Sequence, residues 1–350
     1  MSIFGPFHQR PHAHNNNALI PMHKVSQRLE EEEPMWSMLT LLLLFLVSSV
    51  NGGVEPALLS VGDDLSGGYE KSVTCRAFGP SNTPIDGPSA CWPSNNCKRR
   101  ITDGLFSLED VRKLIAIADK GIALRPRVGG PTIVDINTGY IRDSAGLDNL
   151  FVKSIDIYDA NDFLHYGNVI RKLKQAIMES FSLDRLYFTA PTFITRIDID
   201  TAWSPKEIHD QYWHPHVDRN NTAHYQYSGL LYLSTFGQDF EGGRLLFYPQ
   251  STVAGEQLQP VLPSTGEKAE AEVVVEPKAG RVVMFSSGPE NTHNLEKVTK
   301  GTRYVLSFWF TCDEAKQFDI FLDGKAHVTF SHKMRESMRR KSAKKSSQDL

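Results

Sequence analysis

The sequence predicts an α+β fold, in which an antiparallel β-sandwich or jelly roll carries helices on its outside. The first observation is that 350 residues, 40% of them hydrophobic and 23% charged, can bury a substantial core. The second is that two amphipathic helical patterns precede Leu183. The third is that short runs rich in β-branched and aromatic residues follow it, separated by Gly, Pro and polar turns. This order of elements is typical of two packed antiparallel sheets.

Composition also excludes several classes of protein. The chain has 38 Lys and Arg residues against 41 Asp and Glu, which gives a formal net charge of -3. Nucleic-acid binders usually show a basic excess or a basic stripe, so we expect no nucleic-acid partner. The hydrophobic and charged fractions are those of a globular protein and exclude a collagen-like, fully disordered or multi-span membrane chain.

The N-terminal segment is expected to bring the chain to a membrane. Residues 1–34 mix His, Asn and Pro with the acidic run 30–33, and we predict a disordered tail. Residues 35–53 contain an uncharged apolar run over 35–50, slightly short of the ~20 residues that span a bilayer as a helix. We favour two interpretations of this segment over a third, a buried core helix: the signal anchor of a single-pass membrane protein, or a cleavable signal peptide that starts at Met35. Both favoured interpretations place the rest of the chain in the lumen of the secretory pathway or outside the cell.

The cysteines can be interpreted in that compartment, because oxidising conditions favour disulfides. Cys75, Cys91 and Cys97 lie close together in a stretch rich in Pro, Gly, Ser and Asn, whereas Cys312 lies far along the chain. We expect one pair among the three crowded cysteines and one leftover thiol, and the pairing stays open. Asn220 begins an Asn-Asn-Thr sequon that could carry a glycan in the same compartment.

A helical section over residues 105–190 follows the Cys-containing linker of residues 54–104. Ser107 has the features of an N-cap followed by acidic residues, and an apolar helical stripe continues from it until Pro126. A second stripe predicts a helix from about 162 to 181. The expected role of both helices is to support the core by packing against it.

Six runs predict the strands of the sandwich, which we place within residues 191–315. They cover 192–199, 229–234, 242–249, 271–277, 280–286 and 303–312. The remaining residues, 316–350, carry many Lys and Arg side chains. We expect this segment to be a solvated basic tail.

His216 and Asp218 form the only His-x-Asp motif of the chain. Side chains two positions apart on a strand point to the same face, so this imidazole and this carboxylate can converge on one ion. His293 supplies a second imidazole from a later strand. Two His and one carboxylate with open coordination positions are the ligand set of non-haem Fe(II) oxygenases. His214 is interpreted as a loop histidine, because His216 already has the required spacing to Asp218.

A hairpin register extends this prediction to Arg303. If residues 299–301 form a three-residue loop with its glycine in the left-handed conformation, His293 faces Ser307. Arg303 then lies on the same inward face, about 13 Å away at ~3.3 Å per residue. A long guanidinium and a five-carbon diacid on the metal can bridge that gap, and the guanidinium fork matches a carboxylate. Val305 and Trp309 share the inward face, and the opposite face carries Tyr304, Leu306, Phe308 and Phe310.

Five segments carry a family resemblance. They are WHPHVD (213–218), YSGLLYLS (227–234), DFEGGRLLF (239–247), VEPKAGRVVMFSS (275–287) and HNLEKVTKGTRYVLSFWF (293–310). Over about residues 190–312 their order and spacing resemble the prolyl 4-hydroxylase-like 2-oxoglutarate/Fe(II) dioxygenases, in particular the PKHD-type hydroxylases. The resemblance implies a double-stranded β-helix (jelly roll) with helices packed outside it.

The resemblance also implies the roles of individual residues. His216, Asp218 and His293 would form the catalytic centre that holds Fe(II), and Arg303 would pair with the distal carboxylate of 2-oxoglutarate. The other two implied cofactor-binding residues are Tyr232, near that carboxylate, and Ser307, at an inward position. O2 is the second implied co-substrate, and L-ascorbate (vitamin C) is the implied reductant of oxidised iron.

We therefore expect a 2-oxoglutarate- and Fe(II)-dependent dioxygenase that hydroxylates a C–H bond and releases succinate and CO2. The resemblance makes a protein or peptide side chain, such as proline or lysine, a more plausible substrate than a small molecule. The alternative is a non-catalytic metal-binding jelly roll that acts as an interaction module tethered to the membrane through residues 35–50.

Overall fold

The computed structural model describes residues 55–76, 91, 95–154, 156–199, 203–205, 210–249 and 270–318. The predicted tail 1–34, the segment 35–53 and nearly all of the basic tail 316–350 lie outside the described residues. Within the described ranges, no helix combines the length and the apolar character that crossing a bilayer would need.

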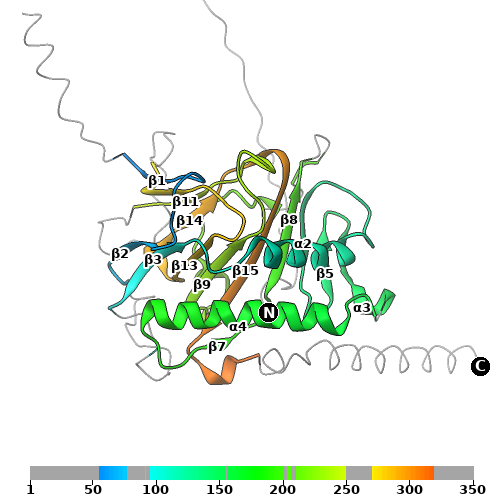
Figure 1. Cartoon of the computed structure of the whole chain (residues 1–350), viewed down its shortest axis with the longest axis horizontal. Coiled ribbons are helices and arrows are strands. Elements are labelled where there is room, and N and C mark those ends of the chain that lie inside the picture. The colour runs from blue at the N-terminus through cyan, green and yellow to red at the C-terminus, as the bar shows by residue number, and fades with distance from the viewer. Residues whose placement is uncertain are drawn as a thin grey trace, which may run out of the picture. The chain divides into compact units, whose positions relative to one another are not determined.

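Two β-sheets form the body of the described structure (Figure 1). The 11-stranded sheet follows the order β2 (Tyr69–Val73), β3 (Cys97–Thr102), β13 (Val282–Ser286), β9 (Tyr227–Tyr232), β15 (Val298–Thr311), β8 (Phe193–Asp198), β4 (Gly130–Val134), β5 (Tyr140–Asp143) and β6 (Gly146–Asn149), while β7 (Tyr187–Phe188) and β10 (Phe240–Gly242) also pair with β15. The four-stranded sheet has the order β1 (Ala57–Leu59), β12 (Val273–Val275), β11 (Leu245–Phe247) and β14 (His293–Leu295).

The chain crosses repeatedly between these sheets. β11 and β12 belong to the small sheet, β13 to the large one, β14 to the small one again and β15 to the large one. All pairings are antiparallel except β1 with β12. This alternation confirms the predicted sandwich. The predicted runs 192–199, 242–249, 271–277 and 280–286 contain β8, β11, β12 and β13, whereas β9 begins two residues before the run 229–234 and β15 begins five residues before the run 303–312.

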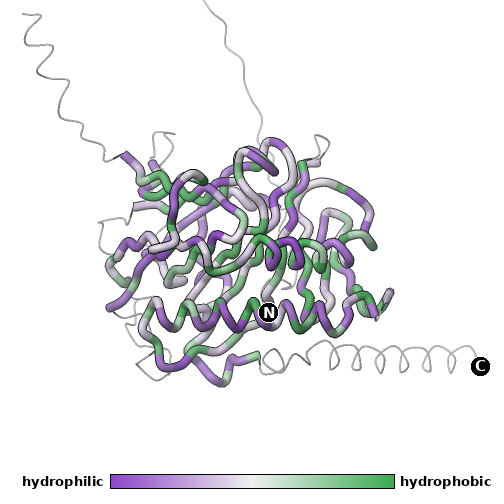
Figure 2. The backbone as a smooth tube through the Cα atoms, viewed as in Figure 1, coloured by the Kyte–Doolittle hydropathy of each residue, from purple (hydrophilic) through white to green (hydrophobic). Residues whose placement is uncertain are grey.

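Both predicted helices are present and cover the outer face of the large sheet (Figure 1). Helix α2 (Leu108–Ile122) begins after the capping box of Ser107 and Asp110. Helix α4 (Ala160–Phe181) begins two residues before the predicted start, because Asp159 caps it. Along α4, hydrophilic and hydrophobic residues alternate (Figure 2), as expected of a helix with one buried face. The described residues also include the short helices α3 (Leu150–Lys153), α5 (Asp218–Asn221), η3 (Pro289–Asn291) and η4 (Glu314–Lys316).

The two faces of β15 contribute to two different cores. Leu306, Phe308 and Phe310 belong to the core between the large sheet and the helices. Val305 belongs to the core between the two sheets, together with Tyr232. The predicted division of this strand into an inward and an outward face is therefore confirmed.

The predicted hairpin between His293 and Cys312 is wrong. β14 pairs with β11, so that His293 faces Phe247, and Ser307 of β15 faces Phe193 and Leu230 instead. Gly301 does adopt a left-handed conformation, with φ 74°, but it lies within β15 opposite Phe240. A Cβ at this position would lie 2.1 Å from the carbonyl oxygen of Asp239, so the close approach of β10 is what requires glycine.

The expectation of a leftover thiol is also wrong. Cys75 pairs with Cys97, and Cys91 pairs with Cys312, so all four cysteines form disulfides. The spacing of the cysteines along the sequence did not predict this pairing, because it depends on a long-range contact: the Tyr227 hydroxyl donates a hydrogen bond to the carbonyl of Cys91 at 2.9 Å and so holds Cys91 next to β9. Tyr227 pairs with Phe310 of β15, close to where Cys312 follows the strand.

We expect the Cys91→Ser/Cys312→Ser variant to lose about 3–5 kcal/mol of unfolding free energy, because its disulfide closes a long loop in the unfolded chain. The two cysteines are 221 positions apart, against 22 for Cys75 and Cys97. Denaturant titration of both double variants under non-reducing conditions measures the difference. The loss for Cys75→Ser/Cys97→Ser should be about 2 kcal/mol smaller, because loop-closure entropy grows with the logarithm of loop length. An equal or larger loss in that second variant would contradict this account.

Candidate metal centre and carboxylate pocket

The two histidines are brought together by their backbones. The His216 N–H donates to the His293 carbonyl at 2.8 Å, and the His293 N–H donates to the His216 carbonyl at 3.0 Å. This isolated antiparallel bridge adds the His216 segment to the free edge of β14. The imidazole rings consequently lie side by side, with centroids 4.4 Å apart.

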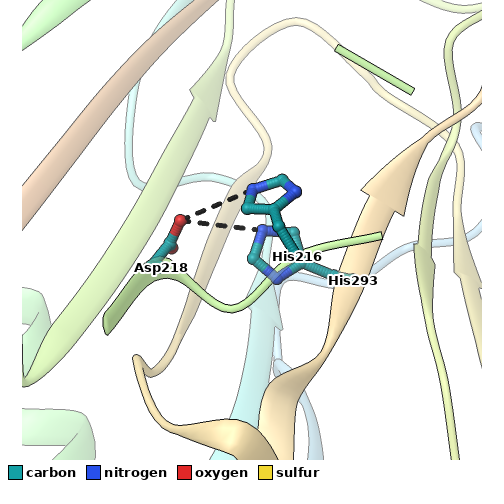
Figure 3. A group of neighbouring side chains, drawn as sticks. All are labelled: His216, Asp218 and His293. Atoms are coloured by element: carbon teal, nitrogen blue, oxygen red, sulfur yellow. Dashed lines mark ion pairs between the residues drawn. The ribbon is translucent and has the colours of Figure 1, made fainter. Parts of the chain in front are cut away.

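Asp218 completes a compact group with these histidines (Figure 3). Its Oδ1 lies 3.6 Å from Nε2 of His216 and 4.0 Å from Nε2 of His293. The three ligand atoms all lie within 4.8 Å of one another. The predicted regular strand through His216 and Asp218 is not present, because Asp218 is the first residue of α5, and a turn brings the carboxylate to the imidazoles. Asp218 and His293 are buried, whereas the half-buried His216 lies toward solvent.

Backbone carbonyls orient both imidazoles. Nδ1 of His216 lies 3.1 Å from the carbonyl oxygen of His214, and Nδ1 of His293 lies 2.9 Å from that of Asn291. A carbonyl oxygen only accepts hydrogen bonds, so Nδ1 carries the proton in both rings. Nε2 of each ring is therefore the nitrogen that lies on the side of Asp218, which is the position that a metal ligand needs.

Burial and mutual charge set the ionisation of the group. Burial raises the pKa of Asp218, but the charges of His293 and His216 and a hydrogen bond from Ser228 outweigh it, so the pKa lies well below its usual value. Burial, followed by repulsion from His216, lowers the pKa of His293 to about 4. Burial also acts to lower the pKa of His216, but its hydrogen bond and attraction to Asp218 raise it overall. An ionised carboxylate beside a neutral imidazole suits a divalent cation.

Arg303 and Tyr232 form a second polar group in the sandwich interior. Both side chains are fully buried, and the guanidinium lies 5.5 Å from the Tyr232 ring centroid. Nε of Arg303 donates to the Gly243 carbonyl at 3.1 Å. Nη1 and Nη2 of Arg303 and the Tyr232 hydroxyl have no hydrogen-bond partner among the described residues. Burial raises the pKa of Tyr232 to about 12, against the opposing charge of Arg303, so its hydroxyl stays protonated as a donor.

Unpaired donors of this kind indicate a missing acceptor, because a buried polar group without a partner destabilises a folded protein. A carboxylate accepts two parallel hydrogen bonds from a guanidinium fork. Arg303 thus lies in the sandwich interior, as predicted, although the hairpin that led to this position does not form, and its role as the anchor for a diacid stays a prediction.

Ser307 and Trp309 follow Val305 on the inward face of β15. Ser307 is buried, and Trp309 lies half-buried opposite Ser228, the residue that hydrogen-bonds Asp218. The Trp309 ring stacks on Tyr225 with centroids 5.3 Å apart and meets Phe193 at 5.2 Å. These rings form an aromatic row, Phe193–Trp309–Tyr225, at the Trp309 end of the inward face of β15.

Two of these positions were missed by sequence reasoning. The first is Gly243, which has φ +64° and at which a Cβ would lie 2.9 Å from Cδ of Arg303. The signal was its place in a Gly-Gly pair directly before a strand. Tyr225 carries no signal in the sequence, because its contact with Trp309 joins separate segments. His214 lies in the loop, as predicted, with its ring centroid 5.7 Å from that of His216.

Comparison with known proteins gives three findings. Residues 206–311 match the family model described as the 2OG-Fe(II) oxygenase superfamily. The chain is 34% identical over 281 residues to the Homo sapiens protein named 2-oxoglutarate and iron-dependent oxygenase domain-containing protein 3, covering 79% of this chain and 80% of that relative. It is 32% identical over 166 residues to Mus musculus prolyl 3-hydroxylase 1, covering 42% of this chain and 19% of that protein. A solved Pseudomonas putida prolyl-4-hydroxylase covers 61% of this chain and 91% of its own, at 18% identity and a TM-score of 0.35.

We expect Arg303→Met to stabilise the metal-free protein by about 1–3 kcal/mol, because the substitution removes buried donors that have no partner. Denaturant unfolding of the metal-free full chain measures this change. Arg281→Met serves as the matched control, because the equally buried Arg281 has its fork bound to Asp103. The control should be destabilised, and destabilisation of both variants to the same extent would contradict the assignment of Arg303.

Proposed function

This chain belongs to the 2OG-Fe(II) oxygenase superfamily and is a 2-oxoglutarate-dependent oxygenase, and from that premise we propose that it hydroxylates a C–H bond of a protein or peptide side chain, such as proline or lysine. The observation that carries the proposal is the pairing of two sites in one sandwich. One is the His216–Asp218–His293 group, and the other is the buried guanidinium of Arg303 with its unpaired donors.

The donor set fits Fe(II), which this family uses. Two neutral imidazole nitrogens and one carboxylate would hold the metal and leave coordination positions open. When bound, Fe(II), 2-oxoglutarate and O2 supply the oxidation, in which the substrate C–H becomes C–OH and 2-oxoglutarate becomes succinate and CO2. The chain's own residues orient the ligands, because the carbonyls of His214 and Asn291 bind Nδ1 of the two imidazoles and leave Nε2 of each ring for the metal. The use of L-ascorbate as reductant stays a prediction from the family resemblance.

Arg303 and Tyr232 would bind the distal carboxylate of 2-oxoglutarate. The charge of the guanidinium complements the carboxylate, and Nη1, Nη2 and the Tyr232 hydroxyl offer three donors to it. Gly243 leaves room for this fork and accepts from its Nε, which fixes the direction of the other two nitrogens. Ser307 would also contribute to this carboxylate site, because it lies two inward positions beyond Arg303 on β15.

The aromatic row Phe193–Trp309–Tyr225 supports a side-chain substrate. Flat aromatic faces at the Trp309 end of β15 would bind the apolar ring of proline or the stem and charge of lysine. The relatives include a prolyl 3-hydroxylase, whose name states the same class of substrate.

Both disulfides support an oxidising compartment, because such bonds rarely persist in the cytosol. We therefore propose that the oxygenase domain lies in the lumen of the secretory pathway or outside the cell. Attachment as a single-pass membrane protein, or release after cleavage of a signal peptide, would follow from residues 35–53. Asn220 is exposed on α5, where a glycan would meet no packed neighbour.

We expect the full-length chain, supplied with Fe(II), ascorbate, 2-oxoglutarate and O2, to form succinate, and His216→Ala to abolish that formation. The variant loses a direct metal ligand, so its Fe(II) affinity should fall by more than the roughly 100-fold that losing an outer-shell partner costs. Calorimetric Fe(II) titration without oxygen measures the affinity, and mass spectrometry measures succinate.

His165→Ala is the control, because His165 lies on α4 and contacts the backbone of Asp110. It should retain both properties. Fe(II) binding by the wild-type chain without any succinate would instead favour the non-catalytic metal-binding alternative.

We expect Arg303→Lys and Tyr232→Phe to raise the KM for 2-oxoglutarate with little change in Fe(II) affinity. Lysine keeps the charge but loses the fork, and removal of a hydrogen bond to a charged group costs about 1.5–3 kcal/mol, or roughly a 10- to 100-fold weaker interaction. Steady-state succinate formation at varied 2-oxoglutarate gives the KM. An unchanged KM in both variants would place the diacid elsewhere.

A further inference from the structure

Arg99 of β3 is a second fully buried arginine, and its contacts converge on the segment that carries His293. We propose that Arg99 is a positioning residue that holds the His293 imidazole in its ligand orientation, an inference that rests on the proposed function. Arg99 itself donates no hydrogen bond to His293. It acts through the turn before His293 and through the aromatic ring behind it.

The polar route passes through Asn291. Nε of Arg99 donates to Oδ1 of Asn291 at 2.8 Å, and Nη2 donates to the Glu290 carbonyl at 3.2 Å. The Asn291 amide nitrogen donates to the carbonyl and hydroxyl of Ser286, at 2.8 and 3.0 Å. The side chain of Asn291 is thus fixed at both ends, and its backbone carbonyl is the acceptor for Nδ1 of His293. Loss of the Arg99 guanidinium would release Asn291, whose backbone carbonyl sets the tautomer of His293.

The apolar route passes through Phe247. The Arg99 guanidinium lies 4.7 Å from the centroid of this ring. Phe247 is the residue of β11 directly opposite His293, and the two ring centroids are 5.7 Å apart. Phe285 contacts the other two aromatic groups, at 5.2 Å from Phe247 and 5.0 Å from His293. The His293 imidazole is therefore held between two groups. One is the turn at Asn291, which accepts a hydrogen bond from Arg99, and the other is the pair of Phe247 and Phe285, of which Phe247 contacts the Arg99 guanidinium.

A third route reaches the segment that carries the other histidine. Nη2 of Arg99 donates to the Tyr248 carbonyl at 3.2 Å, and the Tyr248 hydroxyl donates to Oδ1 of Asn294 at 2.9 Å. The Asn294 amide nitrogen donates to the Trp213 carbonyl at 2.8 Å, three residues before His216. Nη1 of Arg99 forms an ion pair with Glu272 at 2.7 Å, so a carboxylate other than the metal ligand Asp218 balances the charge of the guanidinium.

Arg281 provides a matched comparison in the same sandwich. It is equally buried, and it also pairs with a carboxylate and donates to backbone carbonyls. Its partners are Asp103, Leu59, Ser60, Asp63 and Glu276, none of which is a metal ligand. A purely structural role of buried arginines would give both residues the same effect on metal binding.

The experiment compares Arg99→Met and Arg281→Met in the full-length chain. Two readouts do not depend on turnover: the tautomer of His293 in the metal-free protein, from two-bond ¹⁵N–¹H NMR correlations, and the affinity for Fe(II) from anaerobic calorimetry. We expect Arg99→Met to populate the Nε2–H tautomer of His293 and to weaken Fe(II) binding by roughly 10- to 100-fold. Arg281→Met should lower the melting temperature while both readouts stay at the wild-type value.

Asn291→Ala should reproduce the effect of Arg99→Met, and the double variant should add little to either single change, because both act through one contact. If Arg99→Met fails to fold, Arg99→Lys, which keeps the charge but not the fork, and Asn291→Ala carry the same two readouts. Unchanged tautomer and affinity in the Arg99 and Asn291 variants, or equal weakening in Arg281→Met, would overturn the proposal. A wild-type chain that binds no Fe(II) would overturn the proposed function instead, and the tautomer measurement would still decide the role of Arg99.

Discussion

The backbone pairing of His216 with His293 is the contact on which the rest of the site depends. It places a loop residue on the free edge of β14, whose position β11 already fixes from the other side. The separation of the imidazoles therefore comes from hydrogen bonds of the sheet, while the carbonyls of His214 and Asn291 set only the direction of each ring. Ladder spacing is nearly invariant in proteins, so a metal centre built on it is preorganised before any ligand arrives.

Three fully buried arginines of the sandwich differ in how far hydrogen bonds and ion pairs compensate their buried charge. Arg99 and Arg281 each bind a carboxylate and several carbonyls, so their burial is compensated. Arg303 has only Nε bound to protein, and its two terminal nitrogens face the interior without a partner among the described residues. Such an arrangement is destabilising in itself, and it persists because the surrounding sheets and two disulfides stabilise the fold by more than it costs.

Much of this structure could be predicted from local patterns. The alternation of residue types along β15 predicts its two faces, and the N-cap features of Ser107 predict the start of α2. Pairing partners were less accessible, because the same alternation is compatible with a hairpin to His293 and with the observed pairing to β8 and β9. The Cys91–Cys312 disulfide could not be predicted for the same reason, because only the folded path of the chain brings residues 221 positions apart into contact. Features that depend on local residue types could be predicted from the sequence, whereas features that depend on the pairing of distant segments could not.

The inward face of β15 also orders the parts of the site along one line. Arg303, Val305, Ser307 and Trp309 follow one another at steps of ~6.6 Å, two residues of a strand. Tyr232 lies opposite Val305, next to the anchoring guanidinium, and Ser228, which hydrogen-bonds the carboxylate of Asp218, lies opposite Trp309. Asp218 is thus closer to the Trp309 end of the strand, and the unpaired guanidinium of Arg303 is at the other end. The buried donors and the aromatic row therefore occupy separate positions on one face of one strand, because the alternation of β15 turns every second side chain to the same side.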